Sequence, residues 1–278
     1  MQLGIRVHDV TKLPFEERIA EVRKLGFTCG HLALSKVITE FSTEDEALTP
    51  GLAMYIKNVF AKNEVDIAVL GCYLNLANPN QEQLAKITHR YMAHIRFAAL
   101  LGCGVVGTET GAPNETYTSV PECQTEEALQ TFIDNLRPVV KYAENMGVIV
   151  GIEPVHKHIV STPKRARRVL DEINSPNLQI IFDPVNLLDI TNYQDQNSVI
   201  EEAIELFGED VAVVHLKDFI VRDGKFSSVG CGQGQMNLDP VLKFMKERKP
   251  FIHATLEDTK PENNQRVKHY ITRKYAEA

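Results

Sequence analysis

Residues 148–183 read VIVGIEPVHKHIVSTPKRARRVLDEINSPNLQIIFD and contain two short apolar runs around a charged segment. The runs VIVGIE (148–153) and LQIIFD (178–183) have the length and the Val and Ile content of buried strands. Between them, STPKRARRVLDEIN places hydroxyl residues directly before Pro163, and proline is favoured at the first position of a helix. A strand, a helix and a strand in this order predict a parallel strand pair with a helical crossover.

The same alternation of strand-like and helix-like segments runs through all 278 residues. Eight such units favour a closed barrel over an open doubly wound sheet, and no Gly-x-Gly-x-x-Gly follows the first strand-like run. We therefore predict an α/β fold, a single (β/α)8 TIM barrel forming one domain over residues 1–278. The other six predicted strands are 2–8, 27–34, 65–74, 104–109, 211–217 and 251–257; the other predicted helices are 15–26, 43–63, 80–102, 125–147, 197–208, 238–248 and a terminal helix from residue 261.

Several of these helices carry recognisable end signals. Thr125 precedes the acidic start of the helix over 125–147, and Gly147 follows its last apolar turn. The pair Pro50-Gly51 lies inside the segment 43–63, so the first part of that segment is expected to be a loop or a separate turn.

Charge and composition disfavour several classes of partner. The chain has 30 basic and 37 acidic residues, a net charge of −7, which argues against nucleic acid and anionic membranes. No apolar run reaches the roughly 18 residues of a membrane helix, and the N-terminus lacks a secretory pattern. We expect a cytoplasmic protein. Its five cysteines include no C-x-x-C pair and are expected to be buried free thiols.

Polar residues close the last four predicted strands, each directly after or within an apolar run. They are Glu153, Asp183, His215 and Glu257. The carboxyl ends of parallel barrel strands surround one face, so these four side chains are expected to converge there. Each residue taken alone also fits an ordinary strand-end polar group satisfied by loop amides or an ion pair.

Three carboxylates in one place repel one another unless a proton or a cation lies among them. Oxygen ligands together with one imidazole suit a divalent ion such as Mn²⁺, Co²⁺, Mg²⁺ or Zn²⁺. We therefore predict one divalent metal ion held by the four residues.

The motifs GIEP (151–154), IIFDPVN (180–186), VVHLKD (213–218) and TLED (255–258) resemble the sugar phosphate isomerase/epimerase group of the xylose isomerase-like TIM-barrel superfamily. The stretch VGCGQGQMNLDPVL (229–242) is similar to the glycine loop before that group's last barrel helix. The metal-binding Glu, Asp, His and Glu of the group match the four residues named above.

The resemblance implies a metal-dependent isomerase or epimerase of a ketose or ketose phosphate that works through an enediolate. Glu153 and Glu257 match the pair that acts as acid and base. An inosose-type dehydratase of keto-polyols on the same scaffold stays open, because loss of a β-hydroxyl shares the early steps. A non-catalytic sugar-binding barrel is disfavoured by the two glutamates. The endonuclease branch of the superfamily is disfavoured, because it needs more strand-end histidines and a basic DNA groove, whereas this chain has a net charge of −7. A carbohydrate substrate and a homodimer or homotetramer are the implied partners.

Six further residues are candidate substrate contacts, each with a simpler alternative. His156 and His158 follow Glu153 and otherwise fit exposed loop histidines. Asn186 stands where several epimerases of the group have a substrate-binding histidine. Lys217 fits either a substrate contact or an ion pair with Asp218. Two more candidates are Glu109, which closes the fourth strand, and His8, which closes the first; Tyr73 and Asn75 are weaker.

Overall fold

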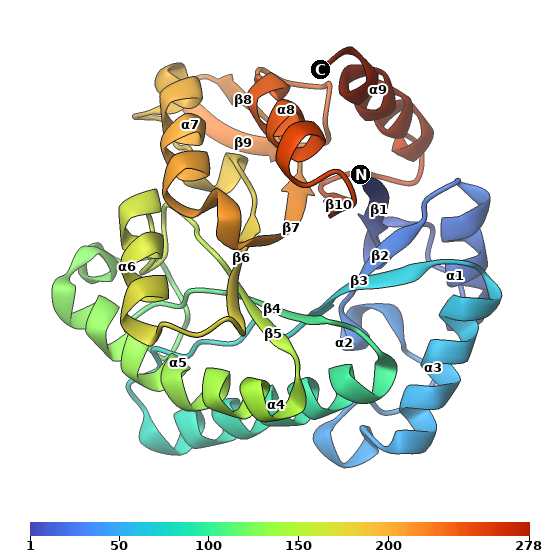
Figure 1. Ribbon diagram of the computed structural model, residues 1–278, viewed down its shortest axis with the longest axis horizontal. Coiled ribbons are helices and arrows are strands. Elements are labelled where there is room, and N and C mark those ends of the chain that lie inside the picture. The colour runs from blue at the N-terminus through green and yellow to red at the C-terminus, as the bar shows by residue number, and fades with distance from the viewer.

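The computed structural model describes residues 1–278 and has a closed barrel of parallel strands at its centre (Figure 1). The strand order is β1-β10-β7-β6-β5-β4-β3-β2, and pairing of β2 with β1 closes the ring. The predicted (β/α)8 barrel is confirmed. The barrel strands are β1 (Gln2–Arg6), β2 (Cys29–Leu32), β3 (Asp66–Gly71), β4 (Val105–Glu109), β5 (Ile149–Glu153), β6 (Leu178–Phe182), β7 (Val211–Leu216) and β10 (His253–Leu256).

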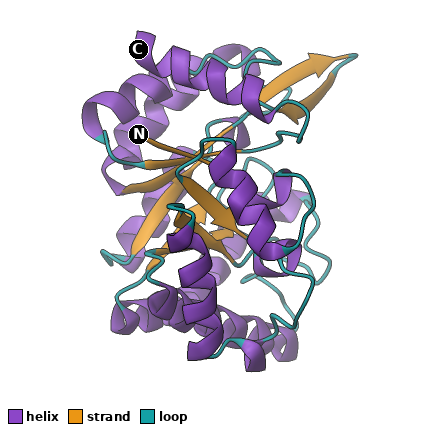
Figure 2. Cartoon of the chain, turned by 90° about the vertical axis from the view of Figure 1, so that its right-hand side faces the viewer, coloured by secondary structure: helices purple, strands orange, loops and turns teal.

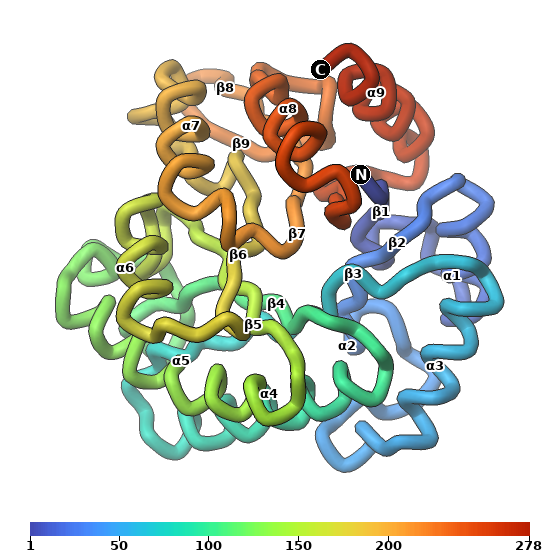
Figure 3. The backbone as a smooth tube through the Cα atoms, in the orientation of Figure 1, coloured from blue at the N-terminus to red at the C-terminus, as the bar shows by residue number.

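Helices surround the barrel (Figure 3), and the N-terminus contacts the last helix of the chain. The amino group of Met1 is 3.1 Å from the hydroxyl of Tyr275. The irregular start expected for the segment 43–63 is confirmed, because a 3-10 turn over Asp45–Ala47 precedes α3. The helices are α1 (Phe15–Lys24), α2 (Leu34–Val37), α3 (Pro50–Lys62), α4 (Gln81–Leu101), α5 (Glu126–Met146), α6 (Pro163–Ile173), α7 (Gln196–Phe207), α8 (Asp239–Arg248) and α9 (Asn264–Glu277).

The predicted capping residues occupy the ends of α5 and α6. The Thr125 side chain accepts a hydrogen bond from the amide of Ala128, and Gly147 ends α5 with φ of 66°. Thr162 caps α6 directly before Pro163. These local contacts satisfy backbone groups that a helix end leaves without partners.

A β-hairpin between β7 and α8 was not among the predicted elements. Strands β8 (Asp218–Arg222) and β9 (Lys225–Val229) pair in antiparallel fashion and project from the body of the molecule (Figure 2). The tip residues Asp223 and Gly224 have φ of 52° and 71°. Positive φ at both positions is typical of the tight turn for which Asp-Gly is the preferred sequence.

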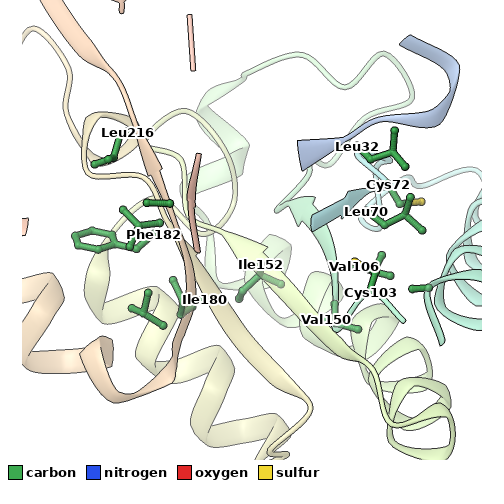
Figure 4. Packing of buried hydrophobic residues seen from close by; sticks show 14 of the residues in the cluster. Leu32, Leu70, Cys72, Cys103, Val106, Val150, Ile152, Ile180, Phe182 and Leu216 are labelled. Atoms are coloured by element: carbon green, nitrogen blue, oxygen red, sulfur yellow. The ribbon is translucent and has the colours of Figure 1, made fainter. Parts of the chain in front are cut away.

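Side chains along the barrel strands alternate between two environments. Outward residues such as Val106, Ile152 and Ile180 pack in the large core cluster (Figure 4). Inward residues such as Ile181 fill the barrel itself. Glycine at 107 makes room for that filling, because a Cβ there would lie 2.7 Å from Ile181. Two positions further along each strand, the same inward direction points into the barrel mouth.

All five cysteines are buried and free, as expected from their spacing. None of the helices has both the length and the apolar character needed to cross a membrane.

Because of the buried His94 on α4, we expect the free energy of unfolding to fall in acid. The ring is 4% exposed. Burial and then the Arg90 charge lower the pKa of His94 to about 4. In the unfolded chain the histidine binds its proton nearer pH 6.5. The contribution of His94 to the stability of the folded protein is therefore present above pH 6.5 and is lost as the pH falls toward 4.

We expect His94→Gln to reduce the loss of unfolding free energy between pH 7 and pH 5 by up to about 2 kcal/mol. Urea denaturation at both pH values measures this, with the exposed His269→Gln as the control. An unchanged pH dependence in His94→Gln would contradict the assignment.

Candidate metal centre and its cavity

The four residues predicted to hold a metal meet at the carboxyl end of the barrel. Each offers one ligand atom, and these atoms all lie within 4.8 Å of one another. Glu153 ends β5, Asp183 follows β6, His215 lies in β7 and Glu257 follows β10. All four residues are buried, and none is more than 5% exposed. The strand-end positions thus bring together residues that are up to 104 apart in the sequence (257 − 153 = 104).

His215 lies between two of the carboxylates. Its Nδ1 is 3.1 Å from Glu257 Oε1 and 3.4 Å from Glu153 Oε2, yet neither ring nitrogen makes a well-directed hydrogen bond. Burial lowers the pKa of His215, but the charges of Glu257 and Glu153 outweigh it and raise this pKa to about 9. Without a metal, the imidazole therefore carries part of the positive charge that the cluster requires.

Glu257 is surrounded by cations. Its Oε2 lies 3.3 Å from a guanidinium nitrogen of Arg6 and 3.6 Å from Lys217 Nζ. Burial raises the pKa of Glu257, but His215, Lys217 and Arg6 together hold it well below its usual range. In the metal-free protein these cations favour the charged form of Glu257.

A chain of polar contacts links Asp183 to Glu153 through Lys217 and Asn186. Lys217 Nζ is 2.9 Å from Asp183 Oδ2 and donates to Asn186 Oδ1 at 2.7 Å. Asn186 Nδ2 donates to Glu153 Oε1 at 2.6 Å. Burial raises the pKa of Asp183 to about 6, even though the charge of Lys217 opposes the rise. The ammonium thus neutralises a carboxylate of the candidate metal cluster.

The alternative expectation that Lys217 pairs with Asp218 is wrong. Asp218 instead accepts hydrogen bonds from four backbone amides. Two of these amides belong to Gly232 and Gly234 in the glycine loop, and a Cβ at Gly234 would lie 1.9 Å from the Phe219 carbonyl oxygen. This loop therefore folds around Asp218. Lys217 is not paired with Asp218 and contacts Asp183 of the cluster instead.

The cluster opens into a cavity of about 520 Å³ at the barrel mouth. Four of the predicted substrate contacts line this cavity: His8, Glu109, Asn186 and Lys217. Burial and the neighbouring Glu153 raise the pKa of Glu109 to about 7, so this carboxyl holds a proton part of the time near neutral pH.

The other two predicted contacts lie outside this cavity. His156 is half-buried, with Nδ1 3.2 Å from the Asn186 carbonyl oxygen, and it lines a neighbouring pocket. His158 is buried against the ring of Tyr117 at 5.3 Å and lies 3.6 Å from Glu109. Each histidine therefore contacts a residue that lines the cavity, Asn186 or Glu109, but does not line the cavity itself.

The structure adds two residues that the sequence argument missed, Arg6 and His31, and it promotes Tyr73, which had been a weak candidate. All three line the cavity. Tyr73 donates a hydrogen bond to Glu153 at 3.4 Å. The only signal in the sequence was a polar residue within an early strand-like run, which for Arg6 is a charged residue near the end of that run.

His31 is 2% exposed, and neither of its ring nitrogens has a partner. Its ring stacks on His215 and on Tyr73, with centroid separations of 5.3 and 5.6 Å. Burial lowers the pKa of His31 far below its ordinary value, so the ring is neutral and free to donate or accept one hydrogen bond.

The donor set fits a divalent metal ion. Three carboxylates and an imidazole whose two nitrogens lack hydrogen-bond partners leave ligand capacity unused in a buried place. Oxygen ligands with a single nitrogen suit Mg²⁺, Mn²⁺, Co²⁺ and Zn²⁺.

Residues 19–271 match the family model described as xylose isomerase-like TIM barrel. The chain belongs to this family. No curated protein sequence matches the chain.

Several solved structures share the fold. A D-tagatose 3-epimerase-like protein aligns over 100% of this chain and 97% of its own, with 20% identity and a TM-score of 0.76. The 3-keto-D-glucoside 4-epimerase of E. coli aligns over 98% and 99%, with 13% identity and a TM-score of 0.75. A protein named IOLI, with a bound zinc atom, aligns over 100% and 97%, with 18% identity and a TM-score of 0.75.

Proposed function

We propose that the protein is a divalent-metal-dependent isomerase or epimerase of a ketose or ketose phosphate. The observation that carries the proposal is the buried cluster of four ligand-bearing side chains at the ends of β5, β6, β7 and β10. Membership of the xylose isomerase-like family and the likeness to sugar epimerases support it.

Glu153, Asp183, His215 and Glu257 are the residues that would hold the ion. A bound divalent ion would supply polarisation of a substrate carbonyl and charge stabilisation for an enediolate. The burial of the four residues strengthens such electrostatic effects.

The two glutamates transfer the protons in this proposal. One carboxylate removes a proton from the carbon beside the carbonyl, and the other returns a proton to the substrate. Their surroundings differ, as an acid and base pair requires: Glu257 contacts cations, whereas Glu153 accepts hydrogen bonds from Asn186 and Tyr73. Either glutamate serves as the base, depending on the configuration of the substrate.

The remaining cavity residues bind and orient the sugar in this proposal. His31 offers a neutral ring with two free nitrogens, and Glu109 offers a carboxyl that is partly protonated near neutral pH. Each matches a sugar hydroxyl, which both donates and accepts hydrogen bonds.

Proton exchange with solvent tests the proposal directly. Protein stripped with a chelator and then reloaded with Mg²⁺, Mn²⁺, Co²⁺ or Zn²⁺ is incubated with a panel of ketoses and ketose phosphates in D₂O. We expect NMR to show loss of the proton beside the carbonyl with at least one substrate, and no exchange in the stripped protein.

Metal analysis of the reloaded protein is the control for this test. Absence of exchange across the panel in protein that holds one ion would contradict the proposal, as would an equal rate in the stripped protein. Mass spectrometry of the product separates isomerisation, which conserves mass, from dehydration, which loses water.

A further inference from the structure

A second group of ligand-bearing side chains overlaps the first at the barrel mouth. His31, His215 and Glu257 each offer one ligand atom, and these three atoms lie within 4.8 Å of one another. The group shares His215 and Glu257 with the four-residue cluster. An ion that contacts the two shared side chains is therefore close to His31, which lies on β2 and outside every motif that resembles the family.

The ring of His31 has unused binding capacity in a buried place. The residue is 2% exposed. Of the nine histidines, only His31 and His215 have both ring nitrogens buried without a hydrogen-bond partner, and their ring centroids are 5.3 Å apart. Buried polar groups nearly always have a partner. A neutral imidazole has one nitrogen lone pair, which can bind a metal ion, and one N–H group, which can donate a hydrogen bond.

The barrel leaves space for the His31 ring. A Cβ at Gly71, the last residue of β3, would lie 2.8 Å from His31 Nε2, so a larger residue at position 71 would displace the ring. The five ligand atoms form two overlapping groups and not one, so ligation by His31 requires the ring to move toward the ion. His31 lines the cavity of about 520 Å³, which gives the ring room for this movement.

The charges around the cluster favour one ion with an additional neutral ligand. The three carboxylates of the cluster are balanced by one divalent ion together with the ammonium of Lys217, which lies 2.9 Å from Asp183. Arg6 is already paired with Asp9 and Asp258. A second divalent ion would leave buried positive charge without a partner, which is costly. A neutral imidazole adds a ligand and no charge.

We propose that His31 is a nitrogen ligand of the divalent ion, so that three carboxylates and two imidazoles hold one ion. This inference rests on the metal site of the proposed function and not on the reaction. Carboxylates suit Mg²⁺ and Mn²⁺, whereas imidazoles suit later transition metals and zinc. The second imidazole therefore makes the site selective for Zn²⁺ or Co²⁺ over Mg²⁺. One ring nitrogen of His31 binds the ion, and the other remains free to bond a sugar hydroxyl.

Proton NMR of the Co²⁺-loaded protein counts the histidine ligands. A histidine bound to paramagnetic Co²⁺ has its ring N–H signal shifted outside the ordinary spectral range, and the signal is absent from protein prepared in D₂O. We expect two such signals in the unmodified protein and one in His31→Gln. A single signal in the unmodified protein would overturn the proposal and leave the four-residue ion site intact.

Ion affinity provides a second readout. Isothermal titration calorimetry with Zn²⁺ and with Mg²⁺ compares His31→Gln with His8→Gln, a histidine of the same cavity that belongs to neither ligand group. We expect His31→Gln to lose at least about tenfold in Zn²⁺ affinity. It should keep its Mg²⁺ affinity, because the amide oxygen of glutamine suits Mg²⁺. His8→Gln should bind both ions as the unmodified protein does.

Unchanged Zn²⁺ affinity in His31→Gln, or equal losses for Zn²⁺ and Mg²⁺, would overturn the proposal. Circular dichroism checks that both variants fold, and the signal count in the unmodified protein decides the question if His31→Gln does not. Two N–H signals in a protein that exchanges no ketose proton would support His31 as a ligand and contradict the proposed reaction. A protein that binds none of these ions would overturn both proposals.

Discussion

Glu153→Gln and Glu257→Gln are each expected to lower kcat by at least about 10³-fold, because an amide cannot exchange the proton that the carboxylate carries. The substitution keeps the shape of the side chain, so the barrel should remain folded. Steady-state turnover and circular dichroism of the purified variants measure the two effects. Glu201→Gln, an exposed position on α7, is the matched control.

The two variants should differ in stability. Glu257 lies among Arg6, His215 and Lys217, so its neutralisation leaves buried cations without their partner. Glu153 instead accepts hydrogen bonds from Asn186 and Tyr73. We therefore expect metal-free Glu257→Gln to melt at a lower temperature than metal-free Glu153→Gln. Full turnover in both variants would refute the assigned proton-transfer roles.

Lys217→Met is expected to destabilise the metal-free protein by about 3 kcal/mol at pH 8, the usual cost of leaving a buried charge without its partner. Lys217 is 6% exposed and lies 2.9 Å from Asp183. Without the ammonium, the pKa of Asp183 rises above its present value of about 6. A carboxyl whose folded pKa is raised loses stability as pH increases, so the defect should be smaller at pH 6 than at pH 8.

A divalent ion should reverse most of this defect, because it supplies the charge that Lys217 provided to the carboxylates. Urea unfolding of Lys217→Met at pH 6 and pH 8, with and without saturating Mg²⁺, measures both effects. The control is Lys243→Met, since Lys243 is a surface lysine on α8. A metal-free variant as stable as the unmodified protein at pH 8 would show that Lys217 does not balance the cluster.

The barrel could be predicted because its signals are local. Val- and Ile-rich runs at regular spacing mark the strands, and residues such as Thr125, Gly147 and Pro163 mark helix ends through contacts a few residues away. The hairpin after β7 also had a local signal, the Asp223-Gly224 turn, but the apolar run in β8 is only three residues long (219–221) and β9 is mostly exposed and polar. Neither strand therefore has the longer apolar run that identified the barrel strands.

The grouping of Glu153, Asp183, His215 and Glu257 was also accessible from the sequence. Side chains alternate along a strand, and parallel barrel strands end at one face, so position alone places these residues together. Position could not assign His156 and His158, because the loop after β5 sets their places, and there they contact Asn186 and Tyr117 instead of lining the cavity.

The sequence by itself determined the alternation of strands and helices, the closed barrel and the four polar residues at its mouth. The tertiary structure alone decided which charges meet there. Arg6 contacts Glu257 across 251 positions of sequence, and Lys217 pairs with Asp183 rather than with its neighbour Asp218. Such contacts depend on strand register and on the closure of β1 against β10, which juxtaposes residues from the two ends of the chain.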